Sequence, residues 1–207
     1  MAREKSQFSA PTVFVVRHGH TAFNKGDDSR LKGTTYDLPL TDEGHGDAQR
    51  AADYLGQLNI GSVKHSKMLR AEQTAKHVSG ATGIDSRPAG FLDPLDVGYL
   101  AGQRRADAQR RIEYYIRNPH KQIPDGESYG EWHNRFADGL TSELKAAERE
   151  PAKARVLVTH SCNAMASKSV VEGEEPEFYG EHSEEPGGVK KLQKTGGRWR
   201  VSDVRLD

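Results

Sequence analysis

The chain has 207 residues, with 30 lysines and arginines against 30 aspartates and glutamates. This length corresponds to one domain, or at most two small ones, and is enough for one hydrophobic core without disulfides or metals. A formal net charge of zero argues against binding to nucleic acid or to a membrane through overall charge. Cys162 is the single cysteine, which excludes an intramolecular disulfide.

The N-terminal residues MAREKSQFSAPT lack the apolar run of a signal peptide. No stretch approaches the ~18 apolar residues of a membrane span. We therefore expect a cytoplasmic protein without a membrane or nucleic-acid partner. Residues 1–11 are polar and end at Pro11, which predicts a flexible N-terminal arm, and residues 12–207 form the predicted single domain.

The first elements along the chain alternate between strand and helix. The apolar, β-branched run TVFVVR predicts a buried strand over residues 12–17, and a long polar loop follows over 19–41. Thr41 is a suitable N-cap for an amphipathic helix that continues to about residue 58. Residues 60–66 then predict a second, weaker strand.

The middle of the chain continues the alternation. Residues 69–78 predict a helix that ends near Gly80, and residues 84–92 a strand interrupted by proline and glycine. A glycine-containing loop over 93–103 leads to a strongly basic helix over 104–117. We interpret the arginines of this helix as a solvated face.

The last third of the chain begins with the loop PDGES (124–128), which leads into a long helix that Pro151 ends. The run RVLVT (155–159) predicts another buried strand. Residues 172–188 are acidic and rich in glycine and proline, which predicts a mobile solvated loop. A closing hairpin is expected over 189–204. The alternation of strands and helices predicts an α/β fold, a three-layer α/β/α sandwich with a mainly parallel central sheet.

Two of the predicted strands end directly before a histidine, TVFVVR before His18 and RVLVT before His160. Either histidine alone is commonly an ordinary hydrogen-bonded side chain. Ligands of open α/β sheets bind at the carboxyl ends of the strands, so the pair indicates one small site. Arg17 and Arg70 are predicted at the same edge, where guanidinium groups bind phosphoryl oxygens. The set indicates phosphoryl transfer through a phosphohistidine.

No phosphate-binding glycine loop is present, and no His, Cys or Asp cluster has metal-ligand spacing. We therefore expect no metal and no cofactor. Protein cations would then neutralise the charge of a phosphate monoester.

The segment VVRHGHTAFN (15–24) resembles the Arg-His-Gly motif of the histidine phosphatase superfamily, which includes the cofactor-dependent phosphoglycerate mutases. The similarity continues in the family's order through residues 31–55, 65–75, 124–128 and 157–161. It covers about residues 12–165.

The resemblance implies a role for each matching residue. His18 matches the nucleophile that becomes phosphorylated. Arg17, Arg70 and His160 match the groups that bind the phosphoryl oxygens, and Asn24 matches an asparagine of the same pocket. The threonine that ends the motif is matched by Thr21, which binds phosphate or supports the loop.

The chain departs from the family's pattern at the general acid. Family members usually place a glutamate in a segment that corresponds to LDPLDVGYLAG (92–102), and Pro94 stands at its position. Asp93 is the first candidate to replace it, Glu127 in PDGES the second, and Asp96 a weaker third.

Two further positions depart from relatives. Ser161 follows the second histidine where the acid-phosphatase branch has an aspartate, and His20 stands where many relatives have glutamate or glutamine.

Three functions are compatible with these residues. The favoured one is a metal-independent phosphatase that hydrolyses small-molecule or peptide phosphate esters. A phosphoglycerate mutase-type phosphotransferase and a non-catalytic phosphate-binding or scaffold protein are the alternatives. A general acid is worth roughly 10²–10⁴ in rate for a poor leaving group, so its displacement bears mainly on the substrate class.

Overall fold

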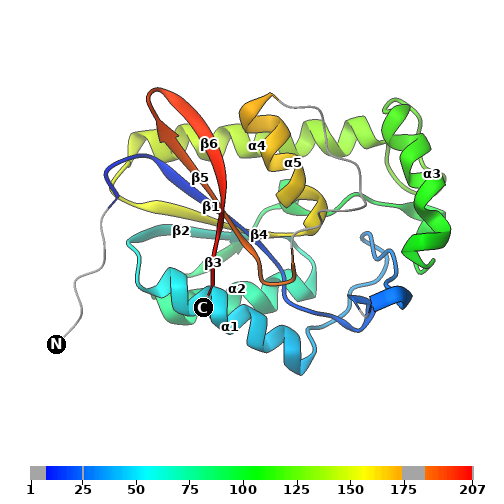
Figure 1. Ribbon diagram of the computed structural model, residues 1–207, viewed down its shortest axis with the longest axis horizontal. Helices are drawn as coiled ribbons and strands as arrows, with labels where there is room; N and C mark the ends of the chain where they lie inside the picture. Colours follow the sequence, from blue (N-terminus) through cyan, green and yellow to red (C-terminus); the bar gives the residue numbers. More distant parts are fainter. Residues whose placement is uncertain (1–7, 25, 174–184, 207) are drawn as a thin grey trace.

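The computed structural model describes residues 8–24, 26–173 and 185–206, and within them a six-stranded sheet forms the centre of the molecule (Figure 1). The strand order is β3-β2-β4-β1-β5-β6. The strands, in chain order, are β1 (Thr12–Arg17), β2 (Ile60–His65), β3 (Ser86–Pro88), β4 (Ala154–Thr159), β5 (Val189–Thr195) and β6 (Arg198–Val204). The first four are mutually parallel, and β5 runs antiparallel to both of its neighbours. The predicted α/β fold with a mainly parallel sheet is confirmed.

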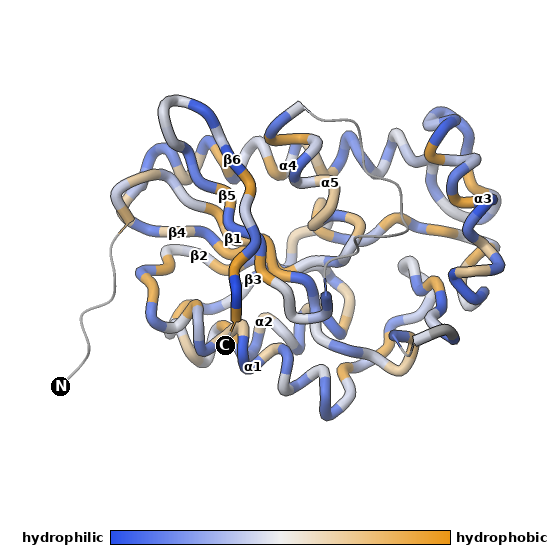
Figure 2. Tube along the Cα trace, in the orientation of Figure 1, coloured by the Kyte–Doolittle hydropathy of each residue, from blue (hydrophilic) through white to orange (hydrophobic). Residues whose placement is uncertain are grey.

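Helices cover both faces of the sheet. Figure 1 shows α1 (Asp42–Gly56) and α2 (Leu69–Thr82) on one side and α4 (Tyr129–Arg149) and α5 (Ser161–Glu172) on the other. Successive side chains of a strand point to opposite faces, so β1 contributes Phe14 and Val16 to one core and Val13 and Val15 to the other. Both faces of β1 are therefore covered, which explains why the strand is buried along its whole length and apolar from Val13 to Val16 (Figure 2).

Side chains at the helix ends explain where the helices begin. The Thr41 hydroxyl accepts a hydrogen bond from the Gly44 amide at the start of α1, as the sequence predicts. At the start of α4, Ser128 and Glu131 form a reciprocal capping box. Because both caps lie beside the loops at the carboxyl edge of the sheet, they also fix where those loops begin and end.

The remaining helix, α3 (Arg105–Arg117), stands beyond the carboxyl edge of the sheet, at the right of Figure 1. The loop after β1 reaches it. An isolated antiparallel bridge pairs Arg30 with Arg104, and the Arg105 amide donates to the Ser29 carbonyl. Together, α3 and this loop enclose the space outside the strand ends.

The structure differs from the predicted elements in three places. Residues 161–172, for which no helix was expected, form α5, whose first seven residues are all buried and so lack an amphipathic pattern. β3 keeps only residues 86–88 of the predicted 84–92, and α2 runs four residues further than predicted, to the left-handed cap at Gly83.

Two predicted segments lie largely outside the described residues. They are the N-terminal arm, of which residues 1–7 are not described, and the acidic loop, of which residues 174–184 are not described. In the described part of the chain, every helix is too short or too polar to span a bilayer.

Candidate active site

The site is built on the adjacent ends of β1 and β4. These strands are parallel, with Arg17 paired to Thr159, so the residues that follow them emerge side by side. The His18 amide donates to the Thr159 carbonyl at 2.9 Å. The imidazole rings of His18 and His160 lie edge to face with centroids 5.1 Å apart, and both residues are buried. The structure therefore brings the two predicted histidines together.

A short contact fixes which nitrogen of His18 is available. Its Nδ1 lies 2.7 Å from the Gly19 carbonyl oxygen. A carbonyl can only accept a hydrogen bond, so Nδ1 carries the proton in the neutral ring and Nε2 keeps its lone pair. A Cβ at Gly19 would overlap the carbonyl oxygen of Gly44 at the start of α1, which explains the need for glycine there. Nε2 is thus the ring nitrogen of His18 with an available lone pair.

The surroundings of His18 keep its ring uncharged. Burial lowers the pKa of His18 well below its usual value, and the positive charges of Arg70, His160, Lys32 and Arg17 lower it further. A neutral imidazole at physiological pH is the form that can attack phosphorus.

His160 is held by a short chain of hydrogen bonds. Its Nε2 lies 2.8 Å from the Ser66 hydroxyl, which donates to Asp93 Oδ1 at 2.8 Å. The same carboxylate oxygen accepts from the Lys67 amide at 2.7 Å. Because the serine proton is committed to Asp93, His160 donates from Nε2, and its Nδ1 remains for a ligand.

Arg70 is almost fully buried at the start of α2 and is fixed by two backbone carbonyls. Its two terminal nitrogens donate to the carbonyls of Gly33 and Tyr36, each at 3.0 Å. The Nε–H has no acceptor among the described residues. Burial lowers the pKa of Arg70 to about 10, so it stays charged at neutral pH. A buried charged donor without an acceptor favours an anionic ligand.

These side chains open into one cleft, of about 70 Å³, which has room for a group the size of several water molecules. None of the described residues that line it is an aspartate or glutamate. Besides the two histidines, five cationic side chains line it: Arg17, Arg30, Lys32, Arg70 and Arg105. The cleft is therefore suited to an anion that carries more than one negative charge.

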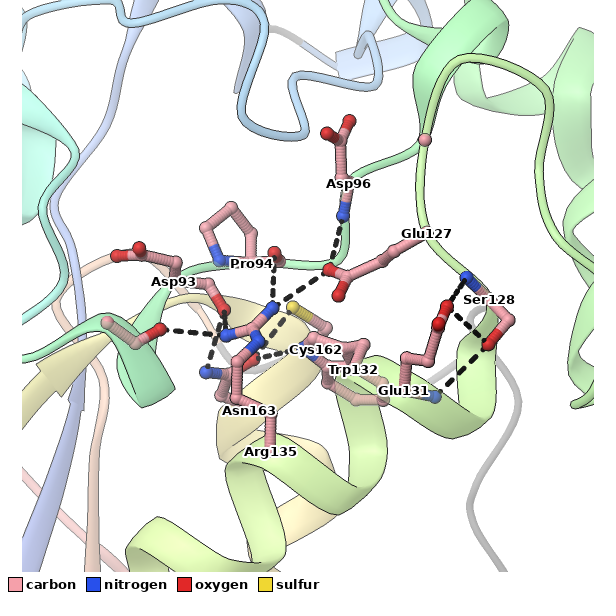
Figure 3. A network of polar contacts seen from close by, with 12 residues as sticks. Asp93, Pro94, Asp96, Glu127, Ser128, Glu131, Trp132, Arg135, Cys162 and Asn163 are labelled. Carbon is pink, nitrogen blue, oxygen red and sulfur yellow. Dashed lines mark hydrogen bonds and ion pairs between the residues drawn. The ribbon is translucent and has the colours of Figure 1, made fainter.

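Pro94 lines this cleft, and the loop that carries it is fixed from behind (Figure 3). The Arg135 guanidinium donates to the carbonyls of Gly90 at 2.8 Å and of Asp93 at 3.3 Å. The Asn163 amide donates to the Leu92 carbonyl at 3.1 Å. These contacts hold the backbone so that a proline, not a carboxylate, faces the cleft.

The two carboxylates predicted as general acids lie elsewhere. Asp93 points away from Arg135 in Figure 3 and is bonded to Ser66 and the Lys67 amide. Glu127 Oε1 accepts from Arg135 at 2.8 Å and from the Asp96 amide at 2.9 Å. Neither residue lines the cleft, because each carboxylate serves to fix the loops around it.

The sequence profile of the histidine phosphatase superfamily (branch 1) matches residues 13–207. The chain belongs to this family. Among its relatives, a probable phosphoglycerate mutase GpmB of Enterobacter is 33% identical over 158 residues, which cover 72% of this chain and 68% of that protein. The zebrafish protein named fructose-2,6-bisphosphatase TIGAR B is 41% identical over 81 residues, 39% of this chain and only 31% of its own length.

Two solved structures share the fold across nearly the whole chain. The mycobacterial glucosyl-3-phosphoglycerate phosphatase Rv2419c, solved in complex with VO3, superposes with a TM-score of 0.77 at 25% identity, covering 96% of this chain and all of that one. TTHB049 from Thermus thermophilus has a TM-score of 0.69 at 26% identity and covers 94% of this chain and 99% of its own. The proteins similar to this chain therefore include ones named as phosphatases and as mutases.

Two residues that the family motif marks lie beside the cleft without lining it. Asn24 accepts from the amide and the hydroxyl of Thr21, at 3.0 and 2.8 Å. The backbone of Thr21 pairs with Leu40 across the loop. Both residues fix the turn after the Arg-His-Gly motif.

Lys32 and Ser66 are not among the site residues predicted from the sequence. Both lie in segments that resemble the family, LKGTTYD and HSKMLRA, so their place in those motifs is the signal that could have identified them. A lysine in a polar loop otherwise looks like a surface charge. In the described part of the chain, no three His, Cys, Asp or Glu side chains are arranged to hold a metal ion.

Proposed function

We propose that this chain is a phosphomonoester hydrolase that acts through a phosphohistidine formed on His18. The observation that carries the proposal is the pair of buried imidazoles, 5.1 Å apart, with Arg17 and Arg70 lining the same cleft. The substrate is a phosphate ester of a small molecule or a peptide.

In the first step, Nε2 of His18 attacks phosphorus, and the bond between phosphorus and the leaving oxygen breaks. Arg17 and Arg70 bind the equatorial oxygens and stabilise the charge that spreads over them. The negative charge of the bound phosphoryl group favours protonation of His160, and Nδ1 of the resulting imidazolium donates to a further oxygen. In the second step, water attacks the phosphohistidine, which releases inorganic phosphate and restores the neutral ring. The arginines supply the positive charge, so turnover needs no added metal ion.

Mutase activity is the second candidate, because curated relatives similar over 72% of this chain are named as probable phosphoglycerate mutases. A mutase begins with the same phosphohistidine but returns the phosphoryl group to a second hydroxyl of its product. A phosphate-binding protein without catalysis would keep the arginines and show neither reaction.

The test uses para-nitrophenyl phosphate, with and without EDTA, and a phosphoglycerate in parallel. The proposal predicts turnover of the aryl ester that EDTA does not inhibit and that His18→Ala abolishes, and inhibition by vanadate. Isomerisation of phosphoglycerate without hydrolysis would refute the phosphatase assignment and support the mutase. Retention of activity within about tenfold in His18→Ala would refute the phosphohistidine, since loss of a nucleophile costs far more.

A further inference from the structure

Hydrolysis of an alkyl phosphate requires a proton for the leaving oxygen, and the residues of the cleft that the structure describes include no carboxylic acid to supply it. Pro94 lines the cleft and has no proton to give, while Asp93 and Glu127 are bonded outside it. If the proposed function holds, the proton comes from another side chain of the cleft or the enzyme works without one.

The titratable side chains that line the cleft can be considered in turn. His18 is the nucleophile, and His160 donates its Nε2 proton to Ser66. The Cys162 thiol donates to the Asn163 side chain at 3.2 Å. The arginines are too basic to release a proton. Among the described residues that line the cleft, Lys32 is the remaining titratable donor.

Lys32 is held in place from both sides by backbone contacts. Before it, Leu31 donates to the Gln103 carbonyl at 3.0 Å and accepts from the Gly102 amide at 2.8 Å. After it, the Gly33 carbonyl accepts from Arg70. The backbone on both sides of Lys32 is therefore held by hydrogen bonds, so its side chain extends from a fixed part of the loop.

The same loop lies against the loop that carries Pro94. Gly33 has a φ of +55°, and a Cβ there would lie 2.9 Å from the Val97 side chain and 3.4 Å from the Leu95 carbonyl oxygen. Glycine thus permits the close approach of the two loops. The loop that carries Lys32 thus lies against the loop that carries Pro94, and both residues line the cleft.

The Lys32 ammonium faces positive charge and, within the part of the chain that the structure describes, forms no ion pair with a carboxylate. The groups that act on it are Arg70 of α2, Arg17 of β1 and Arg105 of α3, and it acts in turn on His18 and His160. Burial and the three arginines lower the pKa of Lys32 well below its usual value. An ammonium in these surroundings releases its proton far more readily than a surface lysine.

We propose that Lys32 is the general acid of this enzyme, donating a proton from Nζ to the leaving oxygen in the cleft where Pro94 provides none. As His18 Nε2 forms its bond to phosphorus, the bond to the ester oxygen breaks and that oxygen takes a proton from Nζ, which leaves a neutral amine. In the second step, the amine removes a proton from the attacking water. Phosphate leaves, and the ammonium and the neutral imidazole are restored. The proposal rests on the proposed function.

The test compares two esters, glycerol phosphate with a poor leaving group and para-nitrophenyl phosphate with a good one. Lys32→Met removes charge and proton, whereas Lys32→Arg keeps the charge but not a transferable proton. Both variants should lose about 10²-fold or more in kcat on the alkyl ester and less than about tenfold on the aryl ester. On the alkyl ester, the wild type should lose activity as the pH rises through the Lys32 pKa, and this alkaline limb should be absent on the aryl ester.

Arg30→Gln is the matched control, because it removes one positive charge from the same cleft without removing a transferable proton. It should change both esters by the same factor. Thermal melting of each variant checks folding.

The outcomes separate the two proposals. If His18 is phosphorylated and both Lys32 variants change the two esters equally, the acid is refuted and the phosphatase stands. If the wild type turns over neither ester and forms no phosphohistidine, both are refuted.

Discussion

Replacing Ser66 with alanine removes the hydroxyl that links His160 to Asp93. His160 is only 4% exposed, so water cannot take the place of the lost acceptor. A buried donor left without a partner costs about 1–3 kcal/mol. If the activation free energy rises by that amount, kcat/KM decreases by roughly fivefold to 150-fold, because 1.36 kcal/mol corresponds to a factor of ten.

The assay is kcat/KM on the aryl and the alkyl ester together. We expect Ser66→Ala to lower both by the same factor, about ten to a hundred, because the hydroxyl orients a phosphoryl-binding ring and delivers no proton. Any part of the cost that falls on the folded state instead lowers the apparent melting temperature, by at most about 12 °C for 3 kcal/mol in a chain of this size.

Ser79→Ala is the matched control, since the Ser79 hydroxyl is buried on α2 with no partner among the described residues. Its loss should change neither activity nor stability measurably. Activity of Ser66→Ala within about twofold of wild type, below the fivefold lower bound, would refute the orienting role of the hydroxyl.

Three further changes test other parts of the site. Glu127→Gln should lower the melting temperature slightly and leave the ratio of alkyl to aryl activity unchanged, and a selective loss on the alkyl ester would make Glu127 the acid. Gly19→Ala should abolish activity, measured with the aryl ester, because its methyl group overlaps the Gly44 carbonyl oxygen; an active, normally folded variant would contradict this packing. The lowered pKa values of His18 and His160 mean that the unfolded chain binds more protons below about pH 6.5, so stability is full above that pH and falls as the pH drops. Urea unfolding at several pH values should show this slope, and replacing both histidines with glutamine should flatten it.

The strands that carry the site could be predicted because they are buried on both faces. β1 and β4 are apolar along nearly their whole length, and their predicted bounds agree with the structure to within a residue. The proximity of His18 and His160 could be predicted too, because each follows directly after one of these adjacent parallel strands. α5 could not be predicted in this way, because burial on all sides of its first two turns removes the helical period from the sequence.

The polar partners of the site could not be predicted, since they depend on contacts between distant loops. Asp93 is next to Pro94 in sequence, yet the carbonyls of this loop are bonded by Arg135 and Asn163, which turns the carboxylate to Ser66. No local pattern contains that information. Lys32 was missed for the same reason, because its burial comes from loops some 70 residues apart.

The most direct test of the central claim is to identify the phosphorylated atom. The enzyme is mixed with an aryl phosphate, quenched rapidly in alkali, which preserves phosphohistidine, and mapped by mass spectrometry and NMR. We expect phosphate on Nε2 of His18 in the wild type and none in His18→Ala. Phosphate on another residue, or continued turnover by an enzyme that never carries phosphate on His18, would contradict it.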